Sequence, residues 1–257
     1  MNRQAFIQKL ESETFDLCII GGGASGAGAA LDAALRGLRV VLIEKNDFSS
    51  GASSKSTKLI HGGVRYLEQA FKNLDLGQLR QVRHGLKERQ ALLENAPHLT
   101  RPLPLLTPVF SWLAGLYYRI GLWLYDRLAS RRDNLPPSRW LSAAEARRRL
   151  PGLHPRLHSA VLYYDGQLDD ARYCLALVQS AVEAGAIALN YAELTGFEKD
   201  AKGRLCLAHV ADVSPTGAEA RWAIRARCFL NCTGPQADGV RQLANPALPT
   251  RIRPSKG

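Results

Sequence analysis

The clearest hydrophobic pattern in the chain is a pair of short apolar runs separated by small residues. Residues 17–20 are apolar and lead into three glycines; an alanine-rich segment follows, and a second apolar run at 40–43 ends on Glu44. Continuous apolar runs of this length are typical of strands that are buried on both faces. The order predicts a strand, a tight turn, a helix and a second strand, which is the βαβ unit of a Rossmann-like α/β fold.

The spacing of the glycines, G-x-G-x-x-G, gives each of them a separate task. Gly21 allows a sharp turn, Gly23 lets the backbone approach a pyrophosphate, and Gly26 lets helix and strand pack closely. The helix N-terminus then directs its N–H groups and positive dipole end at the phosphates. Glu44 comes 18 residues after Gly26, where a carboxylate can bind both hydroxyls of an adenosine ribose and disfavours NADP. The pattern predicts a dinucleotide site and leaves FAD and NAD both open.

Helical spacing and capping signals recur further along the chain. Apolar residues follow a helical period over 73–96, and Ser142 with Glu145 forms a capping box that opens a short helix. A third helix begins at Asp169 and Asp170, whose carboxylates suit the exposed N–H groups of a helix start. We favour capping for this acidic pair, with catalysis as the alternative.

Shorter periods predict strands. Residues 101–108 are proline-rich and extended, and 161–164 form a short apolar run. Three further strands are expected at 187–197, 205–213 and 222–230, separated by turn residues. They predict a β-meander that returns to the nucleotide domain.

Two segments allow two interpretations each. Residues 46–58 hold five serines and one threonine around Gly51, so they form either a mobile linker or a loop that wraps a polar ligand. Their place after the ribose-binding strand favours the loop. Residues 109–125 are rich in Trp and Tyr and carry one charge, Arg119. They predict a buried helix, which we favour, or a helix in a membrane interface, where the basic residues at 127–149 would suit anionic headgroups.

The composition limits the classes of partner that the protein can have. The 257 residues carry a formal charge of +11, which suits a nucleic-acid binder, a protein on anionic lipid, an enzyme of phosphorylated substrates or simply a solvated basic face. No nucleic-acid-binding motif accompanies the charge, so we expect no nucleic-acid partner. The five cysteines form no CxxC pair, which predicts reduced, buried thiols and no metal site. The first fifteen residues lack the apolar core of a signal peptide, which predicts a cytoplasmic protein.

Several motifs are more specific than the nucleotide turn. They read GGGASGAGAALDAALRGLRVVLIEKNDFSSGASSKSTKLIHGGVRYLE (21–68), YYDGQLDDAR (163–172), NCTGP (231–235) and RPSKG (253–257). Together they resemble the N-terminal signature of FAD-dependent glycerol-3-phosphate dehydrogenase, the aerobic respiratory enzyme. The departures from the family pattern, at Ala52, Lys55 and Cys232, remove no group to which we assign chemistry.

The resemblance implies FAD as the cofactor. It also implies an FAD-binding domain like those of glutathione reductase and D-amino-acid oxidase, with an inserted α+β substrate or cap region. The implied cofactor-binding residues lie in the first glycine turn, at the end of the second strand, along the serine-rich segment and in two later glycine turns: Gly21, Gly22, Gly23, Ser25, Gly26, Glu44, Lys45, Ser49, Ser53, Ser54, Ser56, Thr57, Lys58, Gly62, Gly63 and Gly234.

The resemblance further implies a reaction. The C2 alcohol of sn-glycerol 3-phosphate would be oxidised to dihydroxyacetone phosphate, with hydride passing to flavin N5 and electrons to a membrane quinone. Arg65 and Arg253 suit the phosphate because a guanidinium fork binds its oxygens in pairs, and Tyr66 adds a donor. His61 is either the base or a histidine hydrogen-bonded to flavin or backbone. The alternatives are another FAD-dependent amine or hydroxy-acid oxidoreductase, or an inactive nucleotide-binding fragment.

We expect four segments along the chain. They are an FAD-binding βαβ unit and flavin loop at 1–70, a mostly helical insertion at 71–160, a return to the FAD domain at 161–235 and the start of a substrate domain at 236–257. Family members continue well beyond this point, so the resemblance implies roughly the first half of an enzyme, apparently truncated at its C-terminus. It also implies a peripheral protein on the cytoplasmic face of the inner membrane, and an anionic membrane surface stays open as a partner.

Overall fold

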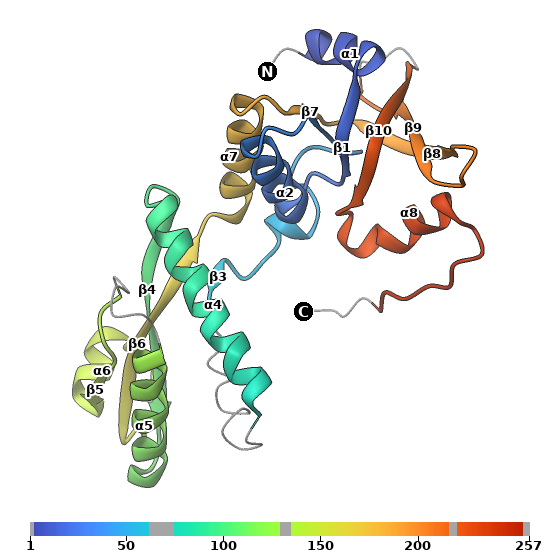
Figure 1. Cartoon of the computed structure of the whole chain (residues 1–257). Coiled ribbons are helices and arrows are strands. Elements are labelled where there is room, and N and C mark those ends of the chain that lie inside the picture. Colours follow the sequence, from blue (N-terminus) through green and yellow to red (C-terminus); the bar gives the residue numbers. More distant parts are fainter. Residues whose placement is uncertain (1–2, 62–74, 129–134, 216–219, 254–257) are drawn as a thin grey trace. The chain divides into compact units, whose positions relative to one another are not determined.

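The computed structural model describes residues 3–61, 75–128, 135–215 and 220–253 (Figure 1). The chain divides into two compact units: unit 1 is Met1–Ser56 with Asp170–Gly257, and unit 2 is Thr57–Asp169. Unit 2 is therefore a continuous insertion, whereas unit 1 is built from both ends of the chain.

Unit 1 is organised around a sheet that has six strands among its described residues, in the order β7-β2-β1-β10-β9-β8. The strands are β1 (Thr14–Ile20), β2 (Val40–Ile43), β7 (Ile187–Leu189), β8 (Ala192–Lys199), β9 (Leu205–Asp212) and β10 (Arg221–Asn231). Strands β7, β2, β1 and β10 run parallel, with Leu17 opposite both Val40 and Cys228. Strands β10, β9 and β8 form an antiparallel meander, so β10 belongs to both halves of the sheet. The predicted βαβ unit and meander are both present.

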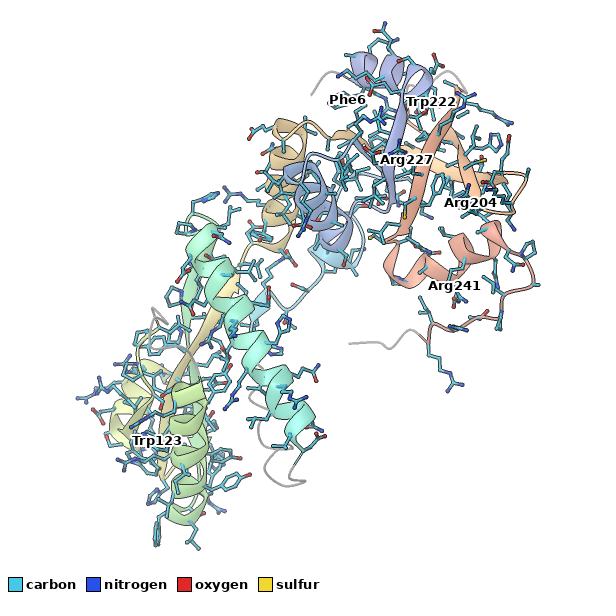
Figure 2. The ribbon with its side chains drawn as sticks, viewed as in Figure 1. Phe6, Trp123, Arg204, Trp222, Arg227 and Arg241 are labelled. Carbon is cyan, nitrogen blue, oxygen red and sulfur yellow. The ribbon has the colours of Figure 1, made fainter. Side chains whose placement is uncertain are left out.

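Helices cover the parallel strands, which are apolar on both faces. The described helices of unit 1 are α1 (Arg3–Ser12), α2 (Ala24–Leu35), α7 (Asp170–Glu183) and α8 (Ala237–Ala244), with short 3₁₀ turns at η1 (Ala52–Ser54) and η2 (Gly234–Gln236). Helices α2 and α7 lie side by side on one face, where Ala27 and Ala30 allow close packing (Figure 1). The other face forms a second core with the meander, in which Phe6 of α1 packs against the cluster that contains Trp222 (Figure 2).

The strand expected at 187–197 is two strands in the structure. Tyr191 has a φ of 51°, which interrupts the extended backbone, and β7 then pairs with β2 whereas β8 pairs with β9. Periodicity does not reveal this break because buried apolar residues, Leu189 and Ala192, continue on both sides of it. Helix α1 has no counterpart among the predicted elements.

Unit 2 is built around one long strand, β6. Its described elements are β3 (Leu59–Ile60), α4 (Leu76–Asn95), β4 (Thr100–Val109), α5 (Trp112–Leu128), β5 (Arg139–Ser142), α6 (Ala143–Arg149) and β6 (Ser159–Leu168). Strand β4 pairs antiparallel with β6 along its whole length, and β3 and β5 pair with the opposite ends of β6. The predicted extended segment at 101–108 is β4, and the strand predicted at 161–164 belongs to the longer β6.

The helix starts of unit 2 follow the sequence signals. The Asp75 carboxylate accepts hydrogen bonds from the N–H groups of Gly77 (2.8 Å) and Gln78 (3.2 Å), and α4 begins directly after it. The predicted capping box between Ser142 and Glu145 is present at the start of α6. No helix among the described residues combines the length and the apolar character that crossing a bilayer requires.

A buried charge pair joins three elements of unit 2. Arg89 of α4 donates from Nη1 to the Asp165 carboxylate of β6 at 2.5 Å, and the Tyr125 hydroxyl of α5 donates to the same oxygen at 3.1 Å. Arg89 and Asp165 are both 2% exposed. Burial raises the pKa of Asp165, and the guanidinium opposes that rise.

The cysteines are less uniformly buried than expected. Cys18 and Cys174 lie in the cores, where burial raises the pKa of Cys18 to about 12 and makes its thiol unreactive. Cys206 and Cys232 are half-buried, and Cys228 is exposed near the end of β10. An apolar run in the sequence therefore did not guarantee burial at the position of Cys228.

Candidate nucleotide-binding site

A cavity of about 630 Å³ opens in unit 1 at the carboxyl ends of the parallel strands. Ile20 and Ile43, the last residues of β1 and β2, line it, and the turn after β10 contributes Thr233 and Gly234. Ligands of open α/β sheets bind outside the carboxyl ends of the strands. The cavity is also large enough for a substantial organic ligand. It lies where the glycine turn predicts a nucleotide.

The three glycines of the turn are required for three different reasons. Gly21 has a φ of +106°, and a Cβ there would lie 2.6 Å from the Cys232 carbonyl oxygen. A Cβ at Gly26 would overlap the Gly21 carbonyl oxygen, so α2 and the turn can approach only because Gly26 has no side chain. A Cβ at Gly23 would meet only the Ser53 side chain, 2.8 Å from its Oγ, and Gly23 lines the cavity. The first and last glycines therefore shape the fold, whereas Gly23 keeps space open for a ligand.

Glu44 ends the second strand with its carboxylate at the cavity. Its Oε2 accepts a hydrogen bond from the Gly22 N–H at 2.7 Å, and its Oε1 accepts one from the Asn46 N–H at 2.8 Å. These two contacts fix the carboxylate in place. A carboxylate has about four acceptor positions, so capacity remains for the ribose hydroxyls that the sequence predicts.

The serine-rich segment 46–58, called the serine loop from here on, is fixed to the glycine turn and contributes to the cavity. The Ser49 N–H donates to the Gly22 carbonyl at 3.0 Å, and Ser49 itself is buried with a φ of 63°. The Ser53 hydroxyl accepts a hydrogen bond from the Ala24 N–H, at the start of α2, at 2.9 Å. Residues 49–53 of the segment line the cavity, which favours the loop over the mobile linker, and ligand binding by this loop stays a prediction.

The predicted cofactor residues fall into four groups. Those that line the cavity are Gly21, Gly23, Glu44, Lys45, Ser49, Ser53 and Gly234. Those in unit 1 that do not line it are Gly22, Ser25, Gly26, Ser54 and Ser56. Thr57 and Lys58 belong to unit 2. Gly62 and Gly63 lie outside the described residues.

One wall of the cavity was not predicted. It is formed by η2 and α8 through Gln236, Gly239, Val240 and Leu243, which recur at the i, i+3, i+4, i+7 spacing of one helix face. That spacing, directly after the predicted glycine turn at Gly234, is the signal that could have identified it.

The structure describes two of the four predicted substrate residues. His61 is exposed directly after β3 in unit 2, and Arg253 is exposed after α8 in unit 1. Arg65 and Tyr66 lie outside the described residues.

A carboxylate of α8 fixes the backbone that leads to Arg253. Asp238 is buried, and its Oδ2 accepts hydrogen bonds from the N–H groups of Arg251 and Ile252, each at 2.7 Å. Arg241, labelled in Figure 2, donates to Oδ1 of the same carboxylate at 2.5 Å. These hydrogen bonds, with that of Ile252 the largest cause, lower the pKa of Asp238.

These residues fit the adenosine diphosphate part of a dinucleotide. Gly23 leaves room for a pyrophosphate beside the N-terminus of α2, and Glu44 presents a fixed carboxylate for the ribose. Fold and site together define a dinucleotide-binding α/β protein. A family model described as FAD dependent oxidoreductase matches residues 16–257, so the chain belongs to that family, and FAD is its cofactor. The choice between FAD and NAD that the glycine turn left open is thereby settled.

Curated relatives confirm the resemblance to glycerol-3-phosphate dehydrogenases. The mitochondrial glycerol-3-phosphate dehydrogenase of Homo sapiens is 44% identical over 100% of this chain and 36% of its own length. The probable mitochondrial glycerol-3-phosphate dehydrogenase of Caenorhabditis elegans is 45% identical over 96% of this chain and 34% of its own length. The chain thus spans about a third of the length of these relatives.

Solved structures agree on the fold. The glycerol-3-phosphate dehydrogenase of Bacillus halodurans, solved with FAD, superposes with a TM-score of 0.70 and 31% identity over 95% of this chain and 39% of that one. The L-proline dehydrogenase of P. horikoshii has a TM-score of 0.66 at 20% identity, over 90% of this chain and 56% of its own, and shows the fold alone. The predicted α/β class with an FAD-binding domain is confirmed.

Proposed function

We propose that the protein that carries this chain oxidises sn-glycerol 3-phosphate to dihydroxyacetone phosphate and passes the electrons to a membrane quinone. The observation that carries the proposal is the 44–45% identity to glycerol-3-phosphate dehydrogenases over almost the whole chain. The cavity supports it, because Gly23 and Glu44 supply the features that a flavin dinucleotide needs. The relatives are named as mitochondrial enzymes, and for this protein we propose the cytoplasmic face of the inner membrane.

The site assignment is part of the proposal. FAD supplies a hydride acceptor when bound. The residues that line the cavity hold its nucleotide part, Thr57 and Lys58 add contacts from the end of the serine loop, and Gly62 and Gly63 add contacts from the segment that follows it. Arg65 and Arg253 bind the substrate phosphate as guanidinium forks, with Tyr66 as a further donor. His61 either accepts the proton of the C2 hydroxyl or holds the flavin by a hydrogen bond.

The test is a comparison of substrates with the protein at its full natural length. We expect flavin reduction by sn-glycerol 3-phosphate and none by sarcosine or 2-hydroxy acids. Arg253→Ala should raise KM about tenfold or more, because a charge-assisted contact to the phosphate is lost. Reduction by sarcosine or a 2-hydroxy acid in preference to glycerol 3-phosphate would identify another FAD-dependent oxidoreductase.

We propose in addition that helix α5 rests on an anionic membrane surface. Its buried side is occupied by Leu122 and Tyr125, while Trp112 and Trp123 are 62% and 53% exposed within this chain. Trp123 is labelled on α5 in Figure 2. Further exposed apolar residues of the same helix are Leu113, Leu116, Tyr117, Tyr118 and Ile120. Aromatic residues favour the membrane interface, and the Arg127 guanidinium, 4.9 Å above the Trp123 ring, suits a lipid phosphate.

Vesicle flotation tests this surface. The chain should float with phosphatidylglycerol vesicles, less with phosphatidylcholine vesicles, and less at high salt. Replacing Trp112 and Trp123 by Ser should reduce binding about tenfold or more because apolar contact area is lost. Equal binding by that double variant would argue against α5 as the contact.

A further inference from the structure

We propose that Asp170 is the positioning residue of the serine loop, and through the loop of the FAD nucleotide. Asp170 is the first residue of α7 and is buried. Its Oδ2 accepts a hydrogen bond from the Ser56 hydroxyl at 2.7 Å and a second from the Ser56 N–H at 3.1 Å. This inference rests on FAD binding by the cavity and deepens the proposed function.

The contacts of Asp170 reach far beyond a local helix cap. Its Oδ1 serves the helix by accepting the Ala171 N–H at 2.8 Å. Its Oδ2 accepts the two hydrogen bonds from Ser56, which is 114 residues away in the sequence. A carboxylate at a helix N-terminus is stabilised by the helix dipole and forms strong hydrogen bonds, so it is well suited to hold a second segment.

Asp170 can affect cofactor binding because it holds the serine loop close to the part that lines the cavity. The Ser49–Ser53 part lines the cavity, and its two ends are fixed to the glycine turn by Ser49 and Ser53. Ser56 is the last residue of the loop in unit 1, and Asp170 fixes it. The cavity-lining part is thereby held from both sides.

The hydrogen bonds to Ser56 reduce the freedom of the residues that lead back to Ser53. Fixing a residue costs conformational entropy, and a loop that is fixed before the ligand arrives does not have to be ordered upon binding. Asp170 does not line the cavity, so it acts through the loop and not by contact with the flavin.

The experiment compares Asp170→Asn with Asp32→Asn in the 257-residue chain. Asp32 is an exposed aspartate on α2 paired with Arg36, so it undergoes the same chemical change away from the loop. Two quantities are measured: amide hydrogen exchange of the serine loop without flavin, and the FAD dissociation constant from quenching of flavin fluorescence. We expect Asp170→Asn to speed exchange at residues 53–56 about tenfold and to weaken FAD about tenfold. Asp32→Asn should change neither.

Ser56→Ala supplies a second, milder variant, because it removes the hydroxyl and keeps the N–H. It should change loop exchange and FAD affinity in the same direction as Asp170→Asn, by a smaller factor. The double variant should bind FAD no more weakly than Asp170→Asn alone, because both changes remove one interaction.

Three outcomes would overturn the inference. Unchanged exchange in both Asp170→Asn and Ser56→Ala would show that the contact does not hold the loop. Faster loop exchange with unchanged FAD affinity would show that the loop is held but does not position the nucleotide. If Asp170→Asn speeds exchange equally in β1 and β10 and Ser56→Ala changes nothing, the role of Asp170 is structural. The proposed function fails separately, when the unmodified chain binds no FAD.

Discussion

At the scale of single residues, the glycines of the turn have different roles: Gly26 is required for the fold, and Gly23 for ligand binding. Gly26→Ala places a methyl group on the Gly21 carbonyl oxygen, whereas Gly23→Ala meets only the Ser53 side chain, whose hydroxyl accepts the Ala24 N–H. We expect Gly26→Ala to lower the free energy of unfolding by about 3 kcal/mol, because overpacking against backbone cannot relax. Gly23→Ala should cost less, about 1 kcal/mol for the displaced hydrogen bond between Ser53 and Ala24, and should weaken FAD at least about tenfold because its methyl group occupies ligand space. Thermal unfolding and flavin titration of both variants measure the two effects.

The two glycines serve as controls for each other. Equal loss of stability in both variants would show that Gly23 is required for the fold and not for the ligand. Full FAD affinity in Gly23→Ala would contradict the placement of the pyrophosphate.

The sequence revealed residues whose role follows from local spacing. The turn at Gly21, the close packing at Gly26 and the position of Glu44 could be read from the order of strand, turn and helix. Asp170 and Asp238 could not be read in this way, because their partners, Ser56 and Arg251, lie on other segments of the chain. Long-range hydrogen bonds depend on how elements pack, and one sequence does not record that.

At the scale of elements, helix α5 depends on a glycine at its inner face. A Cβ at Gly115 would overlap the Trp140 ring of β5 and lie 3.1 Å from Val109, whereas Gly121 has open space around it. We expect Gly115→Ala to destabilise unit 2 by about 2 kcal/mol through overpacking. Gly121→Ala should stabilise it by roughly 0.5–1 kcal/mol, because alanine is the better helix former. Denaturant unfolding measures the change in the free energy of unfolding for both variants. A stabilising Gly115→Ala would contradict the observed orientation of α5.

The attachment of the 248–253 segment to α8 should depend on pH through Asp238. Its pKa is lowered in the folded chain from the ordinary value of 3.8, mainly by the hydrogen bond from Ile252. A lowered pKa means that the contribution is fully present above 3.8 and is lost as the pH falls below it. We expect the amide resonances of Arg251 and Ile252 to report this loss in an NMR titration. Asp238→Asn should abolish that response at every pH, and its persistence would assign the titration to another group.

Sequence patterns predicted the type of most elements better than their pairing. The capping box at Ser142 and the meander were present, and α4 (Leu76–Asn95) lies within the helix predicted at 73–96. The break at Tyr191 and the helix α1 were missed, because the first depends on strand pairing and the second has only a weak apolar face. Within unit 2 the expected strands at 101–108 and 161–164 were read from sequence, whereas β5 (Arg139–Ser142) was missed because four residues carry too short an alternation to be recognised.

At the scale of the whole molecule, two units with separate cores should respond to separate perturbations. FAD should slow hydrogen exchange in β1, β2 and β10, because these strands end at the cavity and ligand binding stabilises the unit that binds it. Asp165→Asn should instead act on β4, β6 and α4. It removes the carboxylate beside the buried Arg89 charge, which costs about 3 kcal/mol and speeds exchange there about 100-fold. Hydrogen exchange followed by mass spectrometry resolves both sets of peptides in one experiment. If Asp165→Asn speeds exchange in β1 as much as in β6, the two units unfold as one, and the division at Ser56 and Asp170 does not describe separately stable parts.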